Sequence, residues 1–172
     1  MRHGEQRKIT TPFEPYCGKM RARFERSRIH GEDMMEKMPT MLDVMTPAPL
    51  TIEVGSSLKQ ARAIMASHGI RHLPVTAVGR LVGLLTDRDM KFALAVGAGV
   101  ADADNVKVED VCLDEPYSVE HSARLDQVLK TMGDLHIGSA LVLRSGKLVG
   151  IFTLVDAAKK LCEILPQMYP DA

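Results

Sequence analysis

The chain has 172 residues, of which 45% are apolar and 26% charged, a balance typical of a globular protein with one ordinary core or two small ones. No apolar run approaches the roughly 18–20 residues that span a bilayer, and the N-terminal stretch lacks the apolar segment of a secretory signal. The 3 cysteines are widely spaced and odd in number, which argues against a disulfide framework and favours the cytoplasm.

The formal net charge is zero, but the charges are distributed unevenly along the chain. Residues 1–30 contain eight Lys/Arg and three Asp/Glu, and the remaining residues carry the opposite excess. We predict a basic N-terminal extension over residues 1–40 that is helical or partly disordered. Its basic residues and Phe24 could contact nucleic acid, although a solvated extension is the more usual form, and its methionines could pack across a dimer partner.

The body of the chain is an internal repeat with a constant offset between its two copies, the offset that separates Gly83 from Gly150. GLLTDRD at residues 83–89 returns as GIFTLVD at residues 150–156, and apolar positions continue to match without a gap between residues 44–89 and 111–156. A unit this small rarely folds alone, so the two copies should share a core about a pseudo-twofold axis.

The repeat divides the chain into predicted segments. Residues 41–104 form the first repeat, residues 105–165 the second, and residues 166–172 a C-terminal tail. Within each repeat we expect the same succession of elements.

The first elements of each repeat are a short strand and a helix. The predicted strands cover residues 49–54 and 116–121, and the predicted helices cover residues 56–69 and 123–136. Ser56 or Ser57 would cap the first of these helices, and Gly69 would end it.

The later elements are a β-hairpin and a second helix. The predicted hairpins cover residues 72–86 and 139–153, with turns at VGR and SGK, and the predicted last helices cover residues 87–96 and 154–165. The order strand, helix, strand, strand, helix predicts an α/β (α+β) fold, with helices packed on small sheets.

The repeated Gly-x-x-Thr-x-x-Asp pattern falls where the last strand ends and the last helix begins. One interpretation is structural, because Thr is a good N-cap and Thr-x-x-Asp resembles a capping box. The other is ligand binding, because a helix N-terminus attracts phosphate and a carboxylate can accept hydrogen bonds from the vicinal hydroxyls of a ribose. Capping boxes prefer Glu or Gln at the acidic position, and both copies have Asp, which favours ligand binding.

Several segments together resemble tandem CBS domains, also called a Bateman module. The resemblance is carried by VMTPAPLTI, GIRHLPV and LVGLLTDRD, and by their counterparts LHIGSALVL and LVGIFTLVD, over residues 41–163. It implies two β-α-β-β-α repeats packed through their small sheets, with two clefts that bind AMP, ADP, ATP or S-adenosylmethionine as regulatory ligands. It also implies flat dimers.

The resemblance also implies a role for particular residues. Asp89 and Asp156 would each bind a ribose, and Thr86 and Thr153 would lie beside the ribose and phosphate. Thr51 and Ser118 would flank the base, with Ile70 and Ile137 as apolar walls. Residues just before the second strand would reach the opposite cleft: Arg71 and His72 from the first repeat, and Gly138 and Ser139 from the second.

The two copies differ where charge matters for a phosphate. The Asp89 motif contains Arg88, whereas the Asp156 motif has Leu154 and Val155 between its Thr and its Asp. Because a phosphate needs a cationic partner, we expect unequal affinities in the two clefts.

No metal-ligand spacing, Walker loop, Gly-x-Gly-x-x-Gly or pairing of a nucleophile with a base is present in the sequence, so catalysis and a metal site are not predicted. The favoured hypothesis is an energy-sensing regulatory module that binds an adenine nucleotide and acts through an effector protein or through assembly. The alternatives are a structural dimerisation module with degenerate clefts, and a nucleic-acid-binding regulator that uses the basic arm.

Overall fold

The structure is a computed structural model that describes residues 38–96 and 106–169. These residues belong to one compact unit, which begins at Met38. The predicted basic arm lies almost entirely outside the described residues, so its predicted structure and its proposed contact with nucleic acid remain predictions.

Each half of the described chain has the predicted succession of strand, helix, strand, strand, helix, preceded by a short helix and a short strand. The first half contains α2 (Met41–Val44), β1 (Thr46–Pro47), β2 (Ile52–Glu53), α3 (Leu58–His68), β3 (His72–Ala77), β4 (Arg80–Thr86) and α4 (Asp87–Val96). The second half contains η2 (Val108–Asp110), β5 (Leu113–Asp114), β6 (Ser118–Glu120), α5 (Leu125–Asp134), β7 (Ser139–Arg144), β8 (Lys147–Thr153) and α6 (Leu154–Met168).

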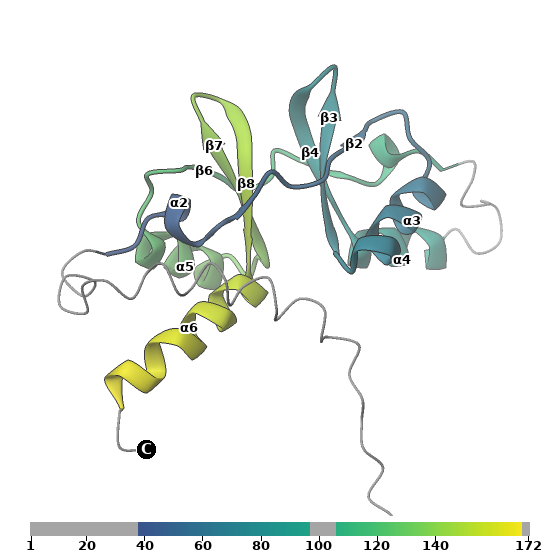
Figure 1. Cartoon of the computed structure of the whole chain (residues 1–172). Helices are drawn as coiled ribbons and strands as arrows, with labels where there is room; N and C mark the ends of the chain where they lie inside the picture. Colours follow the sequence, from purple (N-terminus) through teal and green to yellow (C-terminus); the bar gives the residue numbers. More distant parts are fainter. Residues whose placement is uncertain (1–37, 97–105, 170–172) are drawn as a thin grey trace, which may run out of the picture. The chain divides into compact units, whose positions relative to one another are not determined.

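The strands form two four-stranded sheets, and the two halves exchange an edge strand. One sheet has the order β2-β3-β4-β5 and the other the order β1-β8-β7-β6. Thus β1, near the start of the first repeat, pairs antiparallel with β8 of the second, and β5, near the start of the second repeat, pairs antiparallel with β4 of the first. Figure 1 shows the two hairpins next to each other, with α3 and α4 against one sheet and α5 against the other.

The exchange makes the two predicted repeats depend on each other across their boundaries. Met41 is fully buried in the core of the second repeat, and Val108 is fully buried in the core of the first. Each repeat therefore needs the first residues of the other one, because that segment supplies both a core side chain and an edge strand.

The two sheets meet through a small apolar cluster that follows the internal symmetry. Leu84 and Ile151, which occupy matching positions of the two repeats, are both buried in it together with Leu141. Leu81 and Leu148, a second pair of matching positions, pack against the cluster. The predicted pseudo-twofold packing through the sheets is thus confirmed.

Local signals explain where the helices begin and end. The Ser57 hydroxyl accepts a hydrogen bond from the Gln60 N–H at 3.3 Å, and Gln60 Oε1 accepts one from the Ser57 N–H at 2.9 Å, which completes a capping box at the start of α3. Gly69 ends the same helix in the left-handed region with φ 63°, as predicted. The helix α6 runs to Met168 and contains Pro166, so it continues past the predicted end at residue 165.

Close approach of the exchanged strands explains the repeated glycines. A Cβ on Gly150 would lie 2.8 Å from Met45 Cγ and 3.1 Å from Met45 Cβ, beside β1. A Cβ on Gly83 would lie 2.9 Å from the Leu113 carbonyl oxygen of β5. Both glycines therefore leave room for an edge strand donated by the other repeat.

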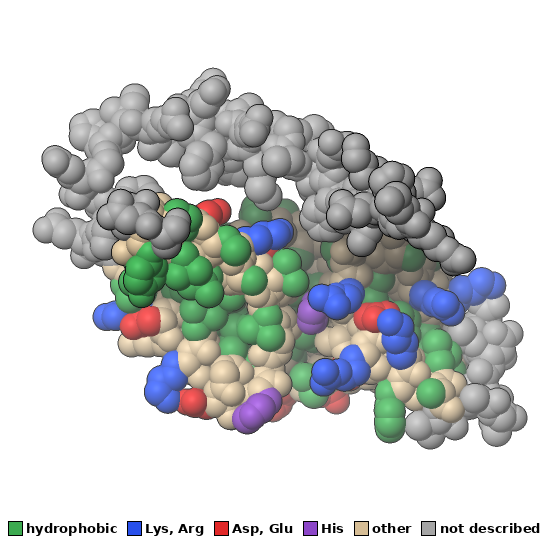
Figure 2. Space-filling view, turned by 90° about the horizontal axis from the view of Figure 1, so that it is seen from below, with side chains coloured by type: hydrophobic (Ala, Val, Ile, Leu, Met, Phe, Trp, Pro, Cys, Tyr) green, Lys and Arg blue, Asp and Glu red, His purple; other side chains and the backbone are tan. Residues whose placement is uncertain are grey.

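One face of the molecule has more apolar side chains over one half and more basic side chains over the other. Figure 2 shows apolar side chains gathered over the α6 half and Lys and Arg side chains gathered over the half that contains α3 and α4. None of the side chains described in α6 is buried, and several large apolar ones are exposed. This helix therefore presents an apolar surface that the described part of the chain does not cover.

Candidate functional site

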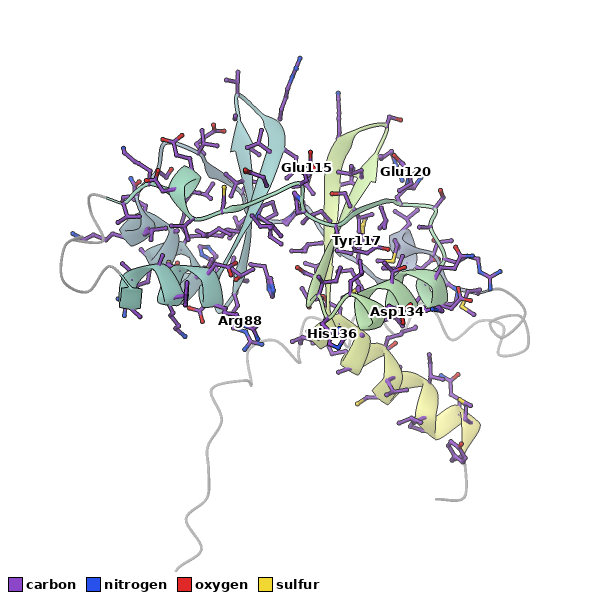
Figure 3. All side chains as sticks on the ribbon, turned by 180° about the vertical axis from the view of Figure 1, so that it is seen from behind. Arg88, Glu115, Tyr117, Glu120, Asp134 and His136 are labelled. Atoms are coloured by element: carbon purple, nitrogen blue, oxygen red, sulfur yellow. The ribbon has the colours of Figure 1, made fainter. Side chains whose placement is uncertain are left out.

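A cleft of about 640 Å³ lies between the two repeats and is lined by residues of both. The first repeat contributes Arg71, His72, Thr86, Asp87, Arg88 and Asp89, and the second contributes Tyr117, Met132, Gly133, His136, Ile137, Gly138, Ser139 and Leu154. Leu84 of β4 and Leu113 of β5 complete the lining. In Figure 3, Arg88 at the start of α4 and His136 after α5 lie near each other, one from each repeat, and Tyr117 lies above His136, on the side of the second repeat.

The Thr86–Asp89 motif positions a carboxylate at the start of α4. The Thr86 hydroxyl donates to Asp89 Oδ2 at 2.5 Å, and it accepts a hydrogen bond from the Asp89 N–H at 3.2 Å. The structural interpretation of the motif as a helix cap is thus correct. The same two residues, Thr86 and Asp89, also line the cleft.

The Thr153–Asp156 motif caps the start of α6. The Thr153 N–H and hydroxyl donate to Asp156 Oδ2 at 2.9 Å and 2.7 Å. The Asp156 N–H donates to the Thr153 hydroxyl at 3.4 Å. The predicted start of this helix is therefore confirmed as a complete capping box.

His72 lies between charges of both signs. Burial lowers its pKa from the ordinary value, and the neighbouring Arg71 guanidinium lowers it further. The Asp89 and Asp156 carboxylates act on this pKa in the opposite direction, which places the His72 imidazole within electrostatic reach of both motifs. A neutral imidazole in this position can become a cation when an anionic group enters the cleft.

Backbone hydrogen bonds tie the loops before β3 and β7 to the starts of the last helices. The Asp87 N–H donates to the Arg71 carbonyl at 2.9 Å, and the Leu154 N–H donates to the Gly138 carbonyl at 3.1 Å. The first of these bonds holds Arg71 next to the Thr86–Asp89 motif of its own repeat.

The structure brings together most, but not all, of the sequence-predicted site residues. Arg71, His72, Thr86, Arg88, Asp89 and Ser139 line the cleft between the repeats. Arg71 and His72 line the same cleft as Asp89, and their predicted contact with the opposite cleft stays a prediction. Ser139 lines that cleft from the second repeat, together with Gly138.

Thr51 and Ser118 are placed differently from the other predicted residues. Thr51 lines a separate cavity near the hairpin turns, of about 830 Å³, together with Glu53 and Arg80. The Ser118 hydroxyl donates to the Pro116 carbonyl at 2.8 Å, and the residue before it, Tyr117, lines the cleft instead. Contact of Thr51 and Ser118 with a base stays a prediction.

Sequence reasoning missed several cleft residues. Tyr117 precedes Ser118, and its aromatic ring is a signal in the sequence for a flat apolar wall. His136 resembles a structural residue at a helix end, but it lies in the left-handed region with φ 56° and lines the cleft. No neighbouring residue in the sequence indicates that Leu113 lines the cleft, since it lies there because β5 pairs with β4 of the other repeat.

Metal clusters and membrane-spanning helices are both absent from the described residues. No group of three or more His, Cys, Asp or Glu side chains in residues 38–96 and 106–169 is placed to hold a metal ion. In the same residues, no helix combines the length and the apolar character needed to cross a bilayer.

Comparison with known proteins identifies the repeat unit. The family described as CBS domain matches residues 42–96 and again residues 108–163. Hypoxic response protein 1 of Mycobacterium tuberculosis is 30% identical over 127 residues, which cover 73% of this chain and 87% of that protein. A solved structure of Hypoxic Response Protein I with two coordinated zinc ions aligns with a TM-score of 0.61 and 28% identity, over 72% of this chain and 100% of the other.

Other similar proteins show two contexts in which the unit occurs. The CBS domain pair of protein MJ0100, solved in complex with 5'-methylthioadenosine and S-adenosyl-L-methionine, aligns with a TM-score of 0.65 and 25% identity, over 74% of this chain and 98% of that one. Inosine-5'-monophosphate dehydrogenase of Korarchaeum cryptofilum is 31% identical over 108 residues, which cover 62% of this chain but only 21% of the enzyme. Since the chain spans about a fifth of that enzyme, the match does not indicate dehydrogenase activity here.

Proposed function

Because the chain belongs to the CBS domain family, with two copies in tandem, we propose that it is a regulatory module that binds AMP, ADP or ATP in the cleft that contains Asp89. The observation that carries the proposal is the placement of the Thr86–Asp89 motif and three cationic or titratable side chains, Arg71, His72 and Arg88, around one cleft. A volume of about 640 Å³ lies within the roughly 300–1,000 Å³ typical of small-molecule sites.

The Asp89 carboxylate suits a ribose. Its Oδ2 accepts a hydrogen bond from the Thr86 hydroxyl, and no hydrogen bond to its Oδ1 is found within the described residues. An ionised carboxylate can accept from two vicinal hydroxyls, and hydrogen bonds to a charged acceptor are stronger than neutral ones. The cap at Thr86 also holds the carboxylate in one position, so little side-chain entropy is lost on binding.

The basic side chains favour a phosphorylated adenosine over the sulfonium of S-adenosylmethionine. Arg88 is exposed at the first turn of α4, and Arg71 and His72 lie at the start of β3. A phosphate between them would gain charge-assisted hydrogen bonds, as well as the favourable field of a helix N-terminus. A sulfonium cation would be repelled by the same groups.

The second repeat supplies an apolar wall for the base. Tyr117, Met132 and Ile137 line the same cleft as the Thr86–Asp89 motif. An adenine ring could stack on the Tyr117 ring and pack on the two aliphatic side chains. A ligand bound in this way would touch both repeats at once.

We propose that a bound nucleotide acts on assembly or on an effector protein through α6. Leu154 lines the cleft and is also the first residue of α6, whose apolar side chains are exposed. A ligand that favours one position of Leu154 would shift the position of α6, and it would thereby favour one arrangement of a homodimer or one partner.

Isothermal titration calorimetry of the full chain with AMP, ATP, adenosine and S-adenosylmethionine tests the proposal. We expect AMP or ATP to bind more tightly than adenosine, and Arg88→Gln to weaken the nucleotides by roughly tenfold while leaving adenosine unchanged. Arg144→Gln is the matched control, because Arg144 is exposed at the end of β7 and does not line the cleft.

The two alternatives predict other outcomes. If no heat is measured with any of the four ligands at millimolar concentration, the chain is better described as a structural dimerisation module with degenerate clefts. If the chain binds DNA or RNA with an affinity that falls steeply with salt and is lost on deletion of residues 1–30, a nucleic-acid-binding regulator is favoured.

A further inference from the structure

The two Thr-x-x-Asp motifs are identical in residue type, but their carboxylates accept different numbers of hydrogen bonds. Asp156 Oδ2 accepts from the Thr153 N–H and hydroxyl, and Asp156 Oδ1 accepts a long hydrogen bond of 3.4 Å from the Thr46 hydroxyl. Asp89 accepts one from the Thr86 hydroxyl, and within the described residues no other donor reaches its carboxylate.

The exchanged edge strands cause part of this difference. Thr46 lies on β1 opposite Ile151 of β8, and its counterpart in the other repeat, Leu113, lies on β5 opposite Leu84 of β4. The two registers are equivalent, so Thr46 and Leu113 occupy matching positions beside the two motifs. Leu113 has no hydroxyl to donate, and it lines the cleft that contains Asp89.

The side chains that can carry a positive charge also differ between the two repeats, and they favour Asp89. Arg71, His72 and Arg88 of the first repeat correspond, in the aligned second repeat, to Gly138, Ser139 and Val155. The groups that could hold a phosphate are therefore concentrated around Asp89, where the carboxylate also has an oxygen with no hydrogen bond within the described residues.

We propose that each chain binds one nucleotide, through Asp89, and that Asp156 is a structural cap whose carboxylate is kept occupied by Thr46 and Thr153. Thr46 is thus a positioning residue, and the residue type at positions 46 and 113 decides which aspartate is available to a ribose. A ribose at Asp156 would have to displace hydrogen bonds that Asp89 does not make. The inference rests on the proposed function, since it concerns the number and place of nucleotides that bind.

Native mass spectrometry and calorimetry of the full chain with AMP measure both the number and the affinity of bound ligands. We expect one AMP per chain. Asp89→Asn should weaken binding by more than about tenfold, whereas Asp156→Asn should keep one AMP per chain with an affinity within about threefold of wild type. Two AMP per chain in wild type, or loss of binding in Asp156→Asn alone, would overturn the inference and leave the proposed function standing.

A second pair of variants keeps both aspartates and isolates one hydroxyl. Leu113→Thr introduces the hydroxyl that Thr46 supplies on the other side, and Leu113→Val introduces a side chain of the same shape as threonine without it. We expect Leu113→Thr to bind AMP roughly tenfold more weakly than Leu113→Val, because the new hydroxyl competes for Asp89. Equal affinities of the two variants would overturn the role given to position 46, even if Asp156→Asn fails to fold. Absence of AMP binding by the wild type would instead overturn the proposed function.

Discussion

His72 links the chemistry of the cleft to pH. Burial and Arg71 lower its pKa in the folded protein below the ordinary value of 6.5, despite the opposing effect of Asp89 and Asp156. Between the lowered pKa and 6.5, the unfolded chain binds more protons than the folded one, so the fold loses stability through this group as the pH falls below 6.5, and the group has no such effect above it.

Nucleotide binding should have the opposite pH dependence. A bound phosphate raises the pKa of His72, so AMP binding should take up a proton, and the affinity of wild type relative to His72→Gln should rise as the pH falls from about 8 to about 6, by at most about tenfold per pH unit. Calorimetry in two buffers of different ionisation enthalpy measures the proton uptake. The His72→Gln variant corrects for titration of the AMP phosphate itself, and parallel pH profiles for the two proteins would show that His72 does not face the phosphate.

Val78 is held in an unfavourable backbone conformation. It occupies the first position of the β3–β4 turn with φ 51°, followed by Gly79 with φ 73°, and its side chain is 97% exposed. A turn with positive φ at both central residues favours Asn-Gly, and a β-branched residue is strained there.

We predict that Val78→Asn raises the free energy of unfolding by roughly 1 kcal/mol, because it removes this strain without losing a buried contact. Ser145, at the equivalent position of the other hairpin with φ 51°, is the matched comparison. Ser145→Asn should stabilise less, since serine is not β-branched. Urea denaturation of the three proteins measures the difference, and a destabilised Val78→Asn would show that the side chain has a role other than the turn.

At the scale of elements, the exchanged strands depend on the motif glycines. A side chain on Gly150 would overlap Met45 just before β1, and Met45 Cβ cannot rotate away as the end of its side chain could. We predict that Gly150→Ala lowers the free energy of unfolding by roughly 1–3 kcal/mol, measured by urea denaturation.

Gly133 provides the control for this substitution. It lies in α5, has nothing within 4 Å of the position of an added Cβ, and corresponds to Ala66 in the first repeat. Gly133→Ala should therefore stabilise the protein by up to about 1 kcal/mol through helix propensity. If Gly150→Ala were equally stabilising, the close contact between Met45 and Gly150 of β8 would be wrong.

The sequence predicted the helices and strands of each repeat, but it did not predict that the two repeats exchange edge strands. Helix caps at Ser57 and Gly69, the hairpin turns and the starts of the last helices are encoded by residues within a few positions of each other, and all are found. By contrast, β1 and β5 have 2 residues each, too few to show an alternating pattern, and their partners lie far along the chain.

The candidate site was predictable to a similar extent. Its repeated carboxylates and hydroxyls followed from the constant offset between the repeats, and the neighbouring Arg88 followed from the motif. The difference in hydrogen bonding between the Asp89 and Asp156 carboxylates depends in part on Thr46. This residue lies far from Asp156 in the sequence and reaches it because β1 pairs with β8. No local pattern in the sequence encodes such a contact.

At the scale of the whole molecule, α6 has an apolar stripe that faces away from the rest of the described chain. The half-buried residues Ala157, Lys160 and Ile164 lie on the side of the helix that faces the body. The exposed stripe repeats at intervals of three and four positions and consists of Leu154, Ala158, Leu161, Leu165 and Met168. Such spacing suits packing against an identical helix across a twofold axis, which supports the predicted homodimer.

We predict that Leu161→Asp shifts the chain from dimer to monomer in sedimentation velocity, because it places a charge at the centre of an apolar helix pair. Leu161 is 54% exposed in the single chain, so the substitution should change the free energy of unfolding of the monomer by less than about 0.5 kcal/mol. Leu135→Asp is the matched control, since Leu135 is 60% exposed but lies outside α6. Equal sedimentation of wild type and Leu161→Asp would place the dimer contact elsewhere, and a monomeric wild type would instead leave this stripe to a different protein partner.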